Sequence, residues 1–288
     1  MATDHQQCPV AVIGAGVMGT AIATTVLGSG LPVVLLDVGQ AELDRAERTI
    51  EIQLRHARMM DALPSGRAPG RLVTTTSSSA LAGARAVVEA VVEHEATKVG
   101  VLTDVAGIVD ADTPLISNTS GIPIDTLADP LPRPQQLIGT HFMNPAYLID
   151  LVEVIRGRRT DEATVTAVTE LLAALNRRAV VVRDSPGFVT SRLLHPMLND
   201  AARLVDEDVA TAEDVDRLMV GCLGHRTGPL RTADLIGLDN LVDSLAALYE
   251  RTGEQRYRPC EQLLAKVHDG HLGQKSGRGF YDYREALS

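Results

Sequence analysis

Short apolar runs alternate with longer stretches of helical periodicity over residues 10–184 of the chain. Several of these runs are nearly continuous in Val, Ile and Leu, as expected for strands that helices cover on both faces of a parallel sheet. Strands that alternate with helices predict an α/β fold with a doubly wound parallel sheet. The predicted strands lie at 10–14, 32–37, 86–91, 114–118, 136–142, 151–155 and 179–184.

The pattern changes after Asp184, where helical spacing replaces the strand runs. Ser185 and Pro186 are typical of an N-cap and a first-turn residue, so they predict a helix start. The spacing of three and four that follows predicts one helical face made of Phe188, Ser191, His195, Leu198, Ala202 and Val205. We therefore expect an N-terminal α/β domain over residues 1–186 and a smaller all-α domain over residues 187–288.

Capping residues mark further helix ends. Thr160 and Asp161 precede an apolar helical stretch, and Thr211 with Asp214 resembles a capping box. Gly224 is typical of a helix C-terminus.

The composition narrows the class of protein. The chain has 288 residues, of which 45% are hydrophobic and 22% charged, close to ordinary globular usage. This excludes a disordered, collagen-like or disulfide-scaffold protein. Because a net charge of −10 repels phosphate backbones, we expect no nucleic-acid partner.

Membrane, export and metal signals are lacking in the sequence. No apolar run approaches the roughly 18 residues that span a bilayer. The first residues, MATDHQQ, contain neither the basic n-region nor the apolar h-region of a signal peptide. Cys8, Cys222 and Cys260 are far apart and lack metal-ligand spacing. We expect a cytoplasmic protein with reduced thiols, no metal and no membrane partner.

A glycine motif follows the first predicted strand and precedes a helical stretch. In the series Gly14-Ala15-Gly16-Val17-Met18-Gly19, Gly14 allows a tight turn, Gly16 lets the backbone approach a pyrophosphate, and Gly19 lets helix and strand pack closely. This predicts a Rossmann-type site in which the turn, including Val17 and Met18, binds a dinucleotide at the helix N-terminus. The alternative is a purely structural glycine turn.

Asp37 ends the next predicted strand. A carboxylate at this position binds ribose hydroxyls and repels a 2′-phosphate, and Val38, Gly39 and Gln40 supply no arginine. We expect NAD rather than NADP as the cofactor. The alternative is that Asp37 serves only in a turn.

Glu153 is anomalous because it lies within the apolar run at 151–155. A buried carboxylate needs a partner, and His141, in the loop-like segment 141–145 after another predicted strand, is a candidate. A carboxylate fixes the tautomer of an imidazole, whose other nitrogen then accepts a hydroxyl proton as a general base. The alternative places Glu153 on the wet face of an edge strand and makes His141 a hydrogen-bonded loop residue.

With these motifs, the chain resembles the 3-hydroxyacyl-CoA dehydrogenase family, including its short 3-hydroxybutyryl-CoA dehydrogenases. The resemblance runs nearly end to end. Its motifs are GAGVMG at 14–19, VVEAVVE at 87–93, SNTS at 117–120, HFMNP at 141–145, LVEVI at 151–155, SPGFV at 185–189, GPLRTADLIGLD at 228–239 and KSGRGFYDY at 275–283.

The resemblance implies roles for particular residues. It makes His141 the catalytic acid or base and Glu153 its orienting partner. Ser117 and Asn144 match positions that bind the substrate oxygen or position the histidine, although capping of a strand end and a loop is the alternative.

Glu93 and Lys98 match positions that line the nicotinamide ribose side of the cofactor site. The alternative for both is a solvated helix N-terminus.

Two residues depart from the family pattern. Ser191 stands where the family usually has asparagine, and Ala96 stands where it commonly has lysine. We therefore expect a substrate pocket unlike the ordinary acyl-CoA pocket. Ser191 is either a substrate contact or a hydroxyl that faces the core.

The implied activity is NAD-dependent oxidation of a 3-hydroxyacyl thioester, or the reverse reduction, with the acyl group on CoA or on an acyl carrier protein. The segments 190–196 and 222–241 resemble dehydrogenases that oxidise glyceryl-acyl carrier protein on the way to polyketide extender units. The alternatives are a sugar-acid dehydrogenase of the gulonate type and a non-catalytic NAD-binding protein like the lens crystallins. We also expect a homodimer formed mainly through the helical domain.

Overall fold

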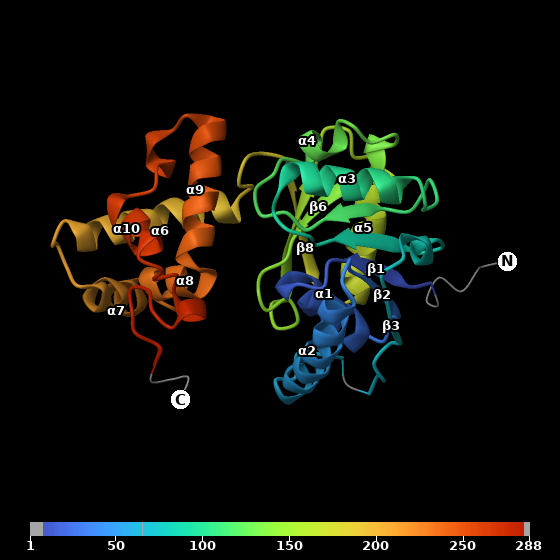
Figure 1. The fold of residues 1–288 in the computed structure, drawn as a ribbon, viewed down its shortest axis with the longest axis horizontal. Coiled ribbons are helices and arrows are strands. Elements are labelled where there is room, and N and C mark those ends of the chain that lie inside the picture. Colours follow the sequence, from blue (N-terminus) through green and yellow to red (C-terminus); the bar gives the residue numbers. More distant parts are fainter. Residues whose placement is uncertain (1–7, 65, 285–288) are drawn as a thin grey trace. The chain divides into compact units, whose positions relative to one another are not determined.

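The computed structural model describes residues 8–64 and 66–284, and the chain forms two compact units that meet in sequence between Ser185 and Pro186 (Figure 1). This division lies one residue before the predicted boundary. No helix within the described ranges is long and apolar enough to cross a membrane.

The N-terminal unit contains an eight-stranded sheet with the order β3-β2-β1-β4-β5-β6-β7-β8. Because β1 lies inside the sheet and the chain crosses over it from β3 to β4, the sheet is wound in both directions, which confirms the Rossmann-type α/β fold. The strands are β1 (Val10–Ile13), β2 (Val33–Leu36), β3 (Leu72–Thr75), β4 (Ala86–Glu89), β5 (Leu115–Ser117), β6 (Leu137–His141), β7 (Leu151–Arg156) and β8 (Arg178–Arg183).

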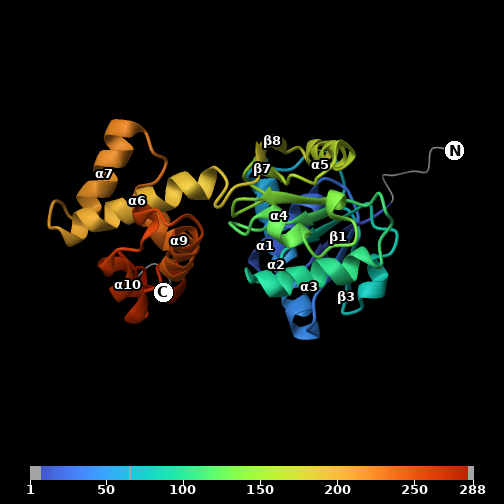
Figure 2. The same ribbon diagram turned by 90° about the horizontal axis from the view of Figure 1, so that it is seen from above.

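Helices cover both faces of this sheet (Figures 1 and 2). Val10 and Val12 belong to a buried cluster with side chains of α1, α2 and α5, whereas the intervening Ala11 is buried on the opposite face. On that opposite face α3 packs beside α4 and contacts β4 and β5. The helices of this unit are α1 (Val17–Gly28), α2 (Gln40–Met59), α3 (Glu95–Ala106), α4 (Ile124–Ala128) and α5 (Glu162–Ala174), with short 3₁₀ turns η1 (Ser78–Leu81) and η2 (Pro134–Gln136).

The sheet is parallel, as predicted, except at one place, where β6 and β7 pair antiparallel. The segment 142–150 that joins them is shorter than the dozen or more residues of a parallel crossover. The short strand β3 also escaped prediction, since it lies half-exposed at the edge of the sheet. At the other edge β8 exposes Val180 and Val181, so it is not covered on both faces as its apolar sequence suggested.

The C-terminal unit is helical, as predicted, and its core contains Leu198, Leu230, Leu241 and Leu263. Its helices are α6 (Thr190–Asp206), α7 (Ala212–Leu223), α8 (Pro229–Ile236), α9 (Leu238–Thr252) and α10 (Glu261–His268), with 3₁₀ turns η3 (Gln255–Tyr257) and η4 (Gln274–Ser276). The predicted capping residues are confirmed. Asp161 accepts a hydrogen bond from the Thr164 amide, Thr211 accepts one from the Asp214 amide, and Gly224 ends α7 in a left-handed conformation.

The predicted helix start at Ser185–Pro186 was wrong, because α6 begins at Thr190. Gly187 and Phe188 have positive φ angles of 70° and 52°, which no α-helix accommodates. Phe188 is buried but precedes the helix. Of the five predicted face residues that lie in α6, Val205 is half-buried and the other four are buried.

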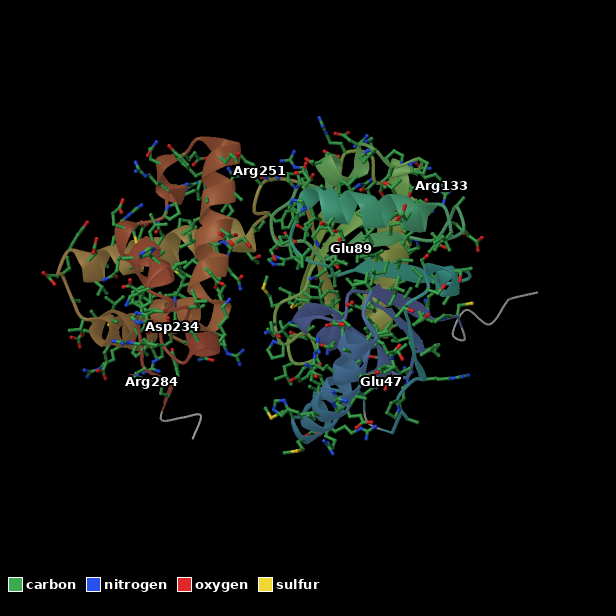
Figure 3. All side chains as sticks on the ribbon, viewed as in Figure 1. Glu47, Glu89, Arg133, Asp234, Arg251 and Arg284 are labelled. Carbon is green, nitrogen blue, oxygen red and sulfur yellow. The ribbon has the colours of Figure 1, made fainter. Side chains whose placement is uncertain are left out.

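Two buried aspartates fasten the last described segment to the helical unit. Asp234, labelled in Figure 3, accepts hydrogen bonds from the amides of Phe280 (2.9 Å) and Tyr281 (3.0 Å) and from the Tyr283 hydroxyl (3.0 Å). Asp216 accepts one from the Tyr281 hydroxyl at 2.7 Å. The C-terminal motif therefore has a structural function within this unit.

Candidate active site

Three polar side chains occupy the last positions of adjacent strands. Glu89 ends β4, Ser117 ends β5 and His141 ends β6. These strands are parallel, so their carboxyl ends lie side by side at the same end of the sheet. Because side chains alternate along a strand and the preceding Val88 and Ile116 face the α1 side, Glu89 and Ser117 project to the α3 side.

His141 and Glu153 are direct cross-strand neighbours of the antiparallel pair β6–β7. The His141 Nδ1 and Glu153 Oε2 atoms are 3.2 Å apart, and the side chains are only 9% and 6% exposed. A carboxylate accepts but does not donate, so Nδ1 carries a proton and Nε2 is the nitrogen that can accept one.

The alternative arrangement of this pair is contradicted. Glu153 is buried, and β7 lies between β6 and β8 rather than at an edge. His141 is the last residue of strand β6. It is therefore not part of a loop, although the sequence around it suggested a loop.

Ser117 is completely buried and donates its hydroxyl proton to Glu89 Oε2 at 2.6 Å. Ser117 and Glu89 are also register partners between β4 and β5. The sequence therefore placed Ser117 at a strand end, but its carboxylate partner emerges only from the sheet register.

Lys98 is not on a solvated helix end, because its side chain is completely buried. Its Nζ atom lies 2.7 Å from Glu89 Oε1 and 3.3 Å from Glu93 Oε2. Glu93 is partly exposed, and its Oε1 accepts hydrogen bonds from the Thr119 hydroxyl (2.6 Å) and the Ser120 amide (2.8 Å). Both predicted ribose-side residues thus belong to one charged network at the ends of β4 and β5.

Asn144 lies three positions beyond His141, and its side chain is exposed. Asn118 instead holds the start of this segment, because its Oδ1 accepts a hydrogen bond from the Phe142 amide at 3.2 Å. The structure does not join Asn144 to the His141–Glu153 hydrogen bond.

The glycine turn has the geometry that a dinucleotide needs. Gly14 has a φ of 102°, and a Cβ there would lie 2.6 Å from the Ala90 carbonyl oxygen. A Cβ at Gly19 would collide with the Gly14 carbonyl oxygen, whereas a Cβ at Gly16 would meet nothing within 4 Å. Gly14 and Gly19 are thus required by the fold, and Gly16 leaves open space at the α1 N-terminus.

The backbone N–H groups at the N-terminus of α1 are not capped by a side chain and can donate hydrogen bonds. Val17 and Met18 form its first turn, which contains no acidic residue, and no side chain caps it. Asp37 follows β2 and accepts a hydrogen bond from the Ala15 amide at 2.6 Å, so its carboxylate lies beside the turn. These residues fit a dinucleotide with its pyrophosphate on α1 and an adenosine ribose at Asp37.

The two departures from the family pattern lie in different units. Ser191 lies in the first turn of α6 in the helical unit and is 3% exposed. Ala96 lies in the first turn of α3 in the sheet unit and is exposed.

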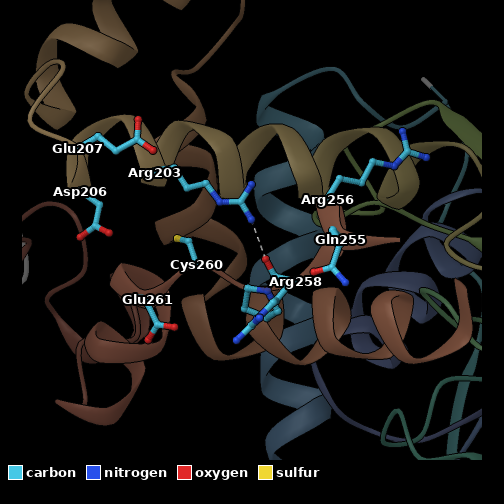
Figure 4. A pocket seen from close by; sticks show the side chains of 9 residues that line it. Arg203, Asp206, Glu207, Gln255, Arg256, Arg258, Cys260 and Glu261 are labelled. Atoms are coloured by element: carbon cyan, nitrogen blue, oxygen red, sulfur yellow. Dashed lines mark hydrogen bonds between the residues drawn. The ribbon is translucent and has the colours of Figure 1, made fainter. Parts of the chain in front are cut away.

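Two hollows lie away from these residues. A cavity of about 490 Å³ in the helical unit is lined by Arg203, Arg256, Cys260 and neighbouring charged side chains (Figure 4). A cavity of about 850 Å³ in the sheet unit is lined by Ser29, Arg85 and other residues that precede strands. It therefore lies at the amino ends of the parallel strands, whereas His141 lies at the carboxyl end of β6. Within residues 8–64 and 66–284, no group of His, Cys, Asp and Glu side chains is arranged to hold a metal.

Glu89 was not among the site residues predicted from the sequence. The available signal was the one that singled out Glu153, a lone carboxylate inside an apolar strand, here in the run Ala86–Glu89. Asn118 gave no comparable signal, because its contact with Phe142 depends on the pairing of β5 with β6.

Comparison with known proteins identifies both units. Residues 9–185 match the NAD binding domain of 3-hydroxyacyl-CoA dehydrogenase, and residues 187–283 match the C-terminal domain of the same family. A probable 3-hydroxybutyryl-CoA dehydrogenase of Deinococcus radiodurans is 42% identical over 276 residues, which cover 94% of this chain and 99% of that protein.

Solved structures agree with the sequence comparison. FadB2 of Mycobacterium tuberculosis is similar with a TM-score of 0.91 at 39% identity, covering 96% of this chain and 98% of that one. The (S)-3-hydroxybutyryl-CoA dehydrogenase PaaH1 of Ralstonia eutropha has a TM-score of 0.88 at 36% identity, with the same coverage of 96% and 98%.

Proposed function

The chain belongs to the 3-hydroxyacyl-CoA dehydrogenase family and is an NAD-dependent oxidoreductase, and from this premise we propose that it interconverts a short 3-hydroxyacyl thioester and its 3-oxo form. The relatives named 3-hydroxybutyryl-CoA dehydrogenase support a four-carbon acyl group on CoA. The observation that carries the proposal is the buried His141–Glu153 hydrogen bond. His141 lies at the carboxyl end of β6, and the dinucleotide-binding turn follows the carboxyl end of β1.

Glu153 holds the imidazole of His141 with its Nδ1 proton directed at the carboxylate. Nε2 then accepts the proton of the substrate 3-hydroxyl as the carbonyl forms, and it returns that proton in the reverse direction. The nicotinamide of bound NAD supplies the acceptor for the hydride that leaves C3. Burial of the pair removes competing water and strengthens its electrostatic coupling.

The test is an NADH absorbance assay of the purified protein with NAD and 3-hydroxybutyryl-CoA, with gulonate and glyceryl-carrier protein measured in parallel. Turnover of the thioester supports the proposal. Turnover of gulonate alone would replace it with the sugar-acid reaction. NAD binding without turnover of any substrate would favour a non-catalytic protein.

We further propose that a glyceryl group on an acyl carrier protein is a second substrate class. Two observations support this, namely Ser191 in place of the family asparagine and Ala96 in place of its lysine. A shorter hydroxyl side chain leaves room for the extra hydroxyl of a glyceryl group and can hydrogen-bond it.

The substitution Ser191→Asn tests this second proposal. It should lower kcat/KM for the glyceryl thioester while sparing or improving that for 3-hydroxybutyryl-CoA. One neutral hydrogen bond and a steric change of about 1–3 kcal/mol would move the specificity ratio by about 5- to 150-fold. A parallel change for both substrates would mean that Ser191 only supports the fold.

We also propose that the enzyme is a homodimer that works in a reducing compartment such as the cytoplasm. Exposed leucines of α7, Leu218 and Leu223, supply an apolar surface on the helical unit. Cys8, Cys222 and Cys260 are all free, as expected where thiols stay reduced.

A further inference from the structure

We propose that the exposed face of α2 is a docking surface for an acyl carrier protein, which binds there through an acidic amphipathic helix. This inference rests on the proposed function, in which a carrier protein presents the thioester. The face consists of Arg48, Ile52, Arg55 and Met59, here called the α2 stripe.

The residues of the α2 stripe share one side of the helix, which runs along the outside of the sheet unit (Figure 1). They recur at spacings of four, three and four, and such residues align along an α-helix. The opposite side is buried and consists of Leu43, Ala46, Ile50 and Ala57. Ile52 is 58% exposed and Met59 is 81% exposed. Large apolar side chains on the outward side of a helix are typical of a contact surface.

The two arginines of the α2 stripe are available to a partner. Both are exposed, and neither forms a hydrogen bond or an ion pair with any residue that the structure describes. No acidic residue follows Glu51 in α2, whereas His56 and Arg58 add further basic groups to its last turns. The stripe therefore combines apolar contact with unpaired positive charge.

This combination fits a narrow acidic partner on a chain whose net charge is −10. Exposed charges are largely screened beyond about 8–10 Å, and a helix is only about 10–12 Å wide. An acidic helix on the stripe thus senses the local arginines, whereas a nucleic acid or an anionic membrane also meets the negative charge around them.

The apolar half of the stripe separates a protein partner from a free phosphate. Carboxylates of an acidic helix would pair with Arg48 and Arg55, while its apolar side chains cover Ile52 and Met59. A phosphate group, free or as part of CoA, binds arginine but leaves both apolar side chains in water.

The C-terminal half of α2 is connected to the segment between the catalytic strands. His56 Nδ1 lies 3.3 Å from the Tyr147 hydroxyl, and the two rings meet edge to face. Tyr147 belongs to the segment 142–150 that joins β6 to β7, six positions after His141, so at most about 21 Å of extended backbone separates them. A pantetheine arm has a comparable length, and a carrier docked on α2 can therefore extend its thioester to His141.

The experiment compares the same acyl group on two carriers, namely 3-hydroxybutyryl-pantetheine and 3-hydroxybutyryl-acyl carrier protein made with the carrier of a type II fatty acid synthase. For the wild-type enzyme at low salt, kcat/KM should be at least about tenfold higher with the carrier protein, because docking adds binding energy and electrostatic steering. Arg48→Glu with Arg55→Glu should abolish this advantage and leave kcat/KM for the pantetheine thioester unchanged.

The matched control is Arg71→Glu with Arg226→Glu. Both arginines are exposed, and among the described residues neither side chain has an ion pair or hydrogen bond, so the control changes net charge equally but away from α2. It should keep most of the advantage.

A second stripe variant, Ile52→Gln with Met59→Gln, retains both arginines. It should also reduce the advantage, since the apolar contact is lost. An advantage that survives in both stripe variants would overturn the docking surface.

A binding measurement without turnover separates this inference from the proposed reaction. Fluorescence anisotropy of a labelled holo-carrier protein should saturate on titration with the wild-type enzyme and with the control, but not with the arginine variant at the same concentrations. Equal binding by all three proteins would contradict the proposal. Saturation without turnover of either thioester would reject the reaction and retain the docking surface.

Two further results would assign the α2 stripe to another ligand. A loss of kcat/KM that is confined to 3-hydroxybutyryl-CoA would make it a phosphate site. A smaller light-scattering mass of the arginine variant alone would make it an interface between two copies of the chain. Either result would overturn the proposal.

Discussion

At the scale of single residues, the proposed site contains carboxylates buried inside apolar strands. Glu89 and Glu153 are at most 7% exposed, and burying such groups is costly unless donors satisfy them. Each has a strand neighbour that donates to it, Ser117 for Glu89 and His141 for Glu153. Because a buried carboxylate requires a donor, each of these glutamates fixes the orientation of its neighbour, Ser117 or His141.

The His141–Glu153 pair should behave as one unit in mutant kinetics. His141→Gln should leave NADH binding intact and lower turnover by about 10²–10⁴, the usual contribution of general acid–base catalysis. Glu153→Gln should cost nearly as much, because it releases the imidazole from its productive tautomer. Steady-state rates of both single variants and of the double variant provide the measurement. A double loss equal to the product of the single losses would show that the residues act independently.

At the scale of elements, the α1 N-terminus separates what the fold needs from what the cofactor needs. Gly19 is crowded by the Gly14 carbonyl, whereas Gly16 faces open space. The same glycine motif thus contains residues with different physical purposes.

Two alanine substitutions should separate these purposes. Gly16→Ala should keep the Tm of the cofactor-free protein, because the backbone there has an ordinary φ of −75°, but it should weaken NADH binding by at least about tenfold by filling the pyrophosphate site. Gly19→Ala should instead lower Tm, since its Cβ collides with backbone. Thermal melts and NADH titrations of both variants test this. Full NADH affinity in Gly16→Ala would place the pyrophosphate elsewhere.

Asp234, which fastens the C-terminal segment, should give the helical unit a distinct pH dependence. Burial raises the pKa of its carboxyl above the ordinary value of 3.8. The folded protein then binds this proton more tightly than the unfolded chain, so the contribution of the group to stability falls as pH rises from about 3.8 through the raised pKa.

In the Asp234→Asn variant the side chain at position 234 cannot ionise. This contribution to the pH dependence of stability is therefore absent from the variant. The difference in free energy of unfolding between wild type and variant should therefore decrease with rising pH across that window, by about 1.4 kcal/mol per unit of pKa shift. Urea titrations at a series of pH values measure it. A constant difference would show that Asp234 titrates alike in both states.

At the scale of the whole molecule, the residues with proposed roles lie in two compact units. The sheet unit contains the dinucleotide turn, Ser117, His141 and Glu153, and the helical unit contains Ser191. Large apolar side chains of α7 are exposed, Leu218 at 59% and Leu223 at 67%. Apolar surface of this kind is typical of a protein–protein interface.

The proposed homodimer should use this surface. Light scattering at micromolar concentration should give a mass near twice the 30.7 kDa of the chain. Leu218→Glu with Leu223→Glu should shift the mass toward that of a single chain, because buried charge is costly at an interface. The exposed Val38→Glu in the sheet unit is the control. A wild-type mass near 31 kDa would contradict the proposal.

The sequence by itself determined the features that depend on local interactions. Alternating apolar runs predicted the α/β unit, helical spacing predicted the second unit, and Asp161, Thr211 and Gly224 marked helix ends, because capping involves residues a few positions apart. The glycine motif and the resemblance to known dehydrogenases indicated NAD, and both domains match that family.

Only the tertiary structure decided which distant residues meet. The antiparallel pairing of β6 with β7 sets His141 opposite Glu153, and the register of β4 with β5 sets Glu89 opposite Ser117. Lys98 looked like a surface lysine and is buried between two carboxylates. Strand order and register arise from the packing of the whole sheet, so no local sequence pattern encodes these contacts.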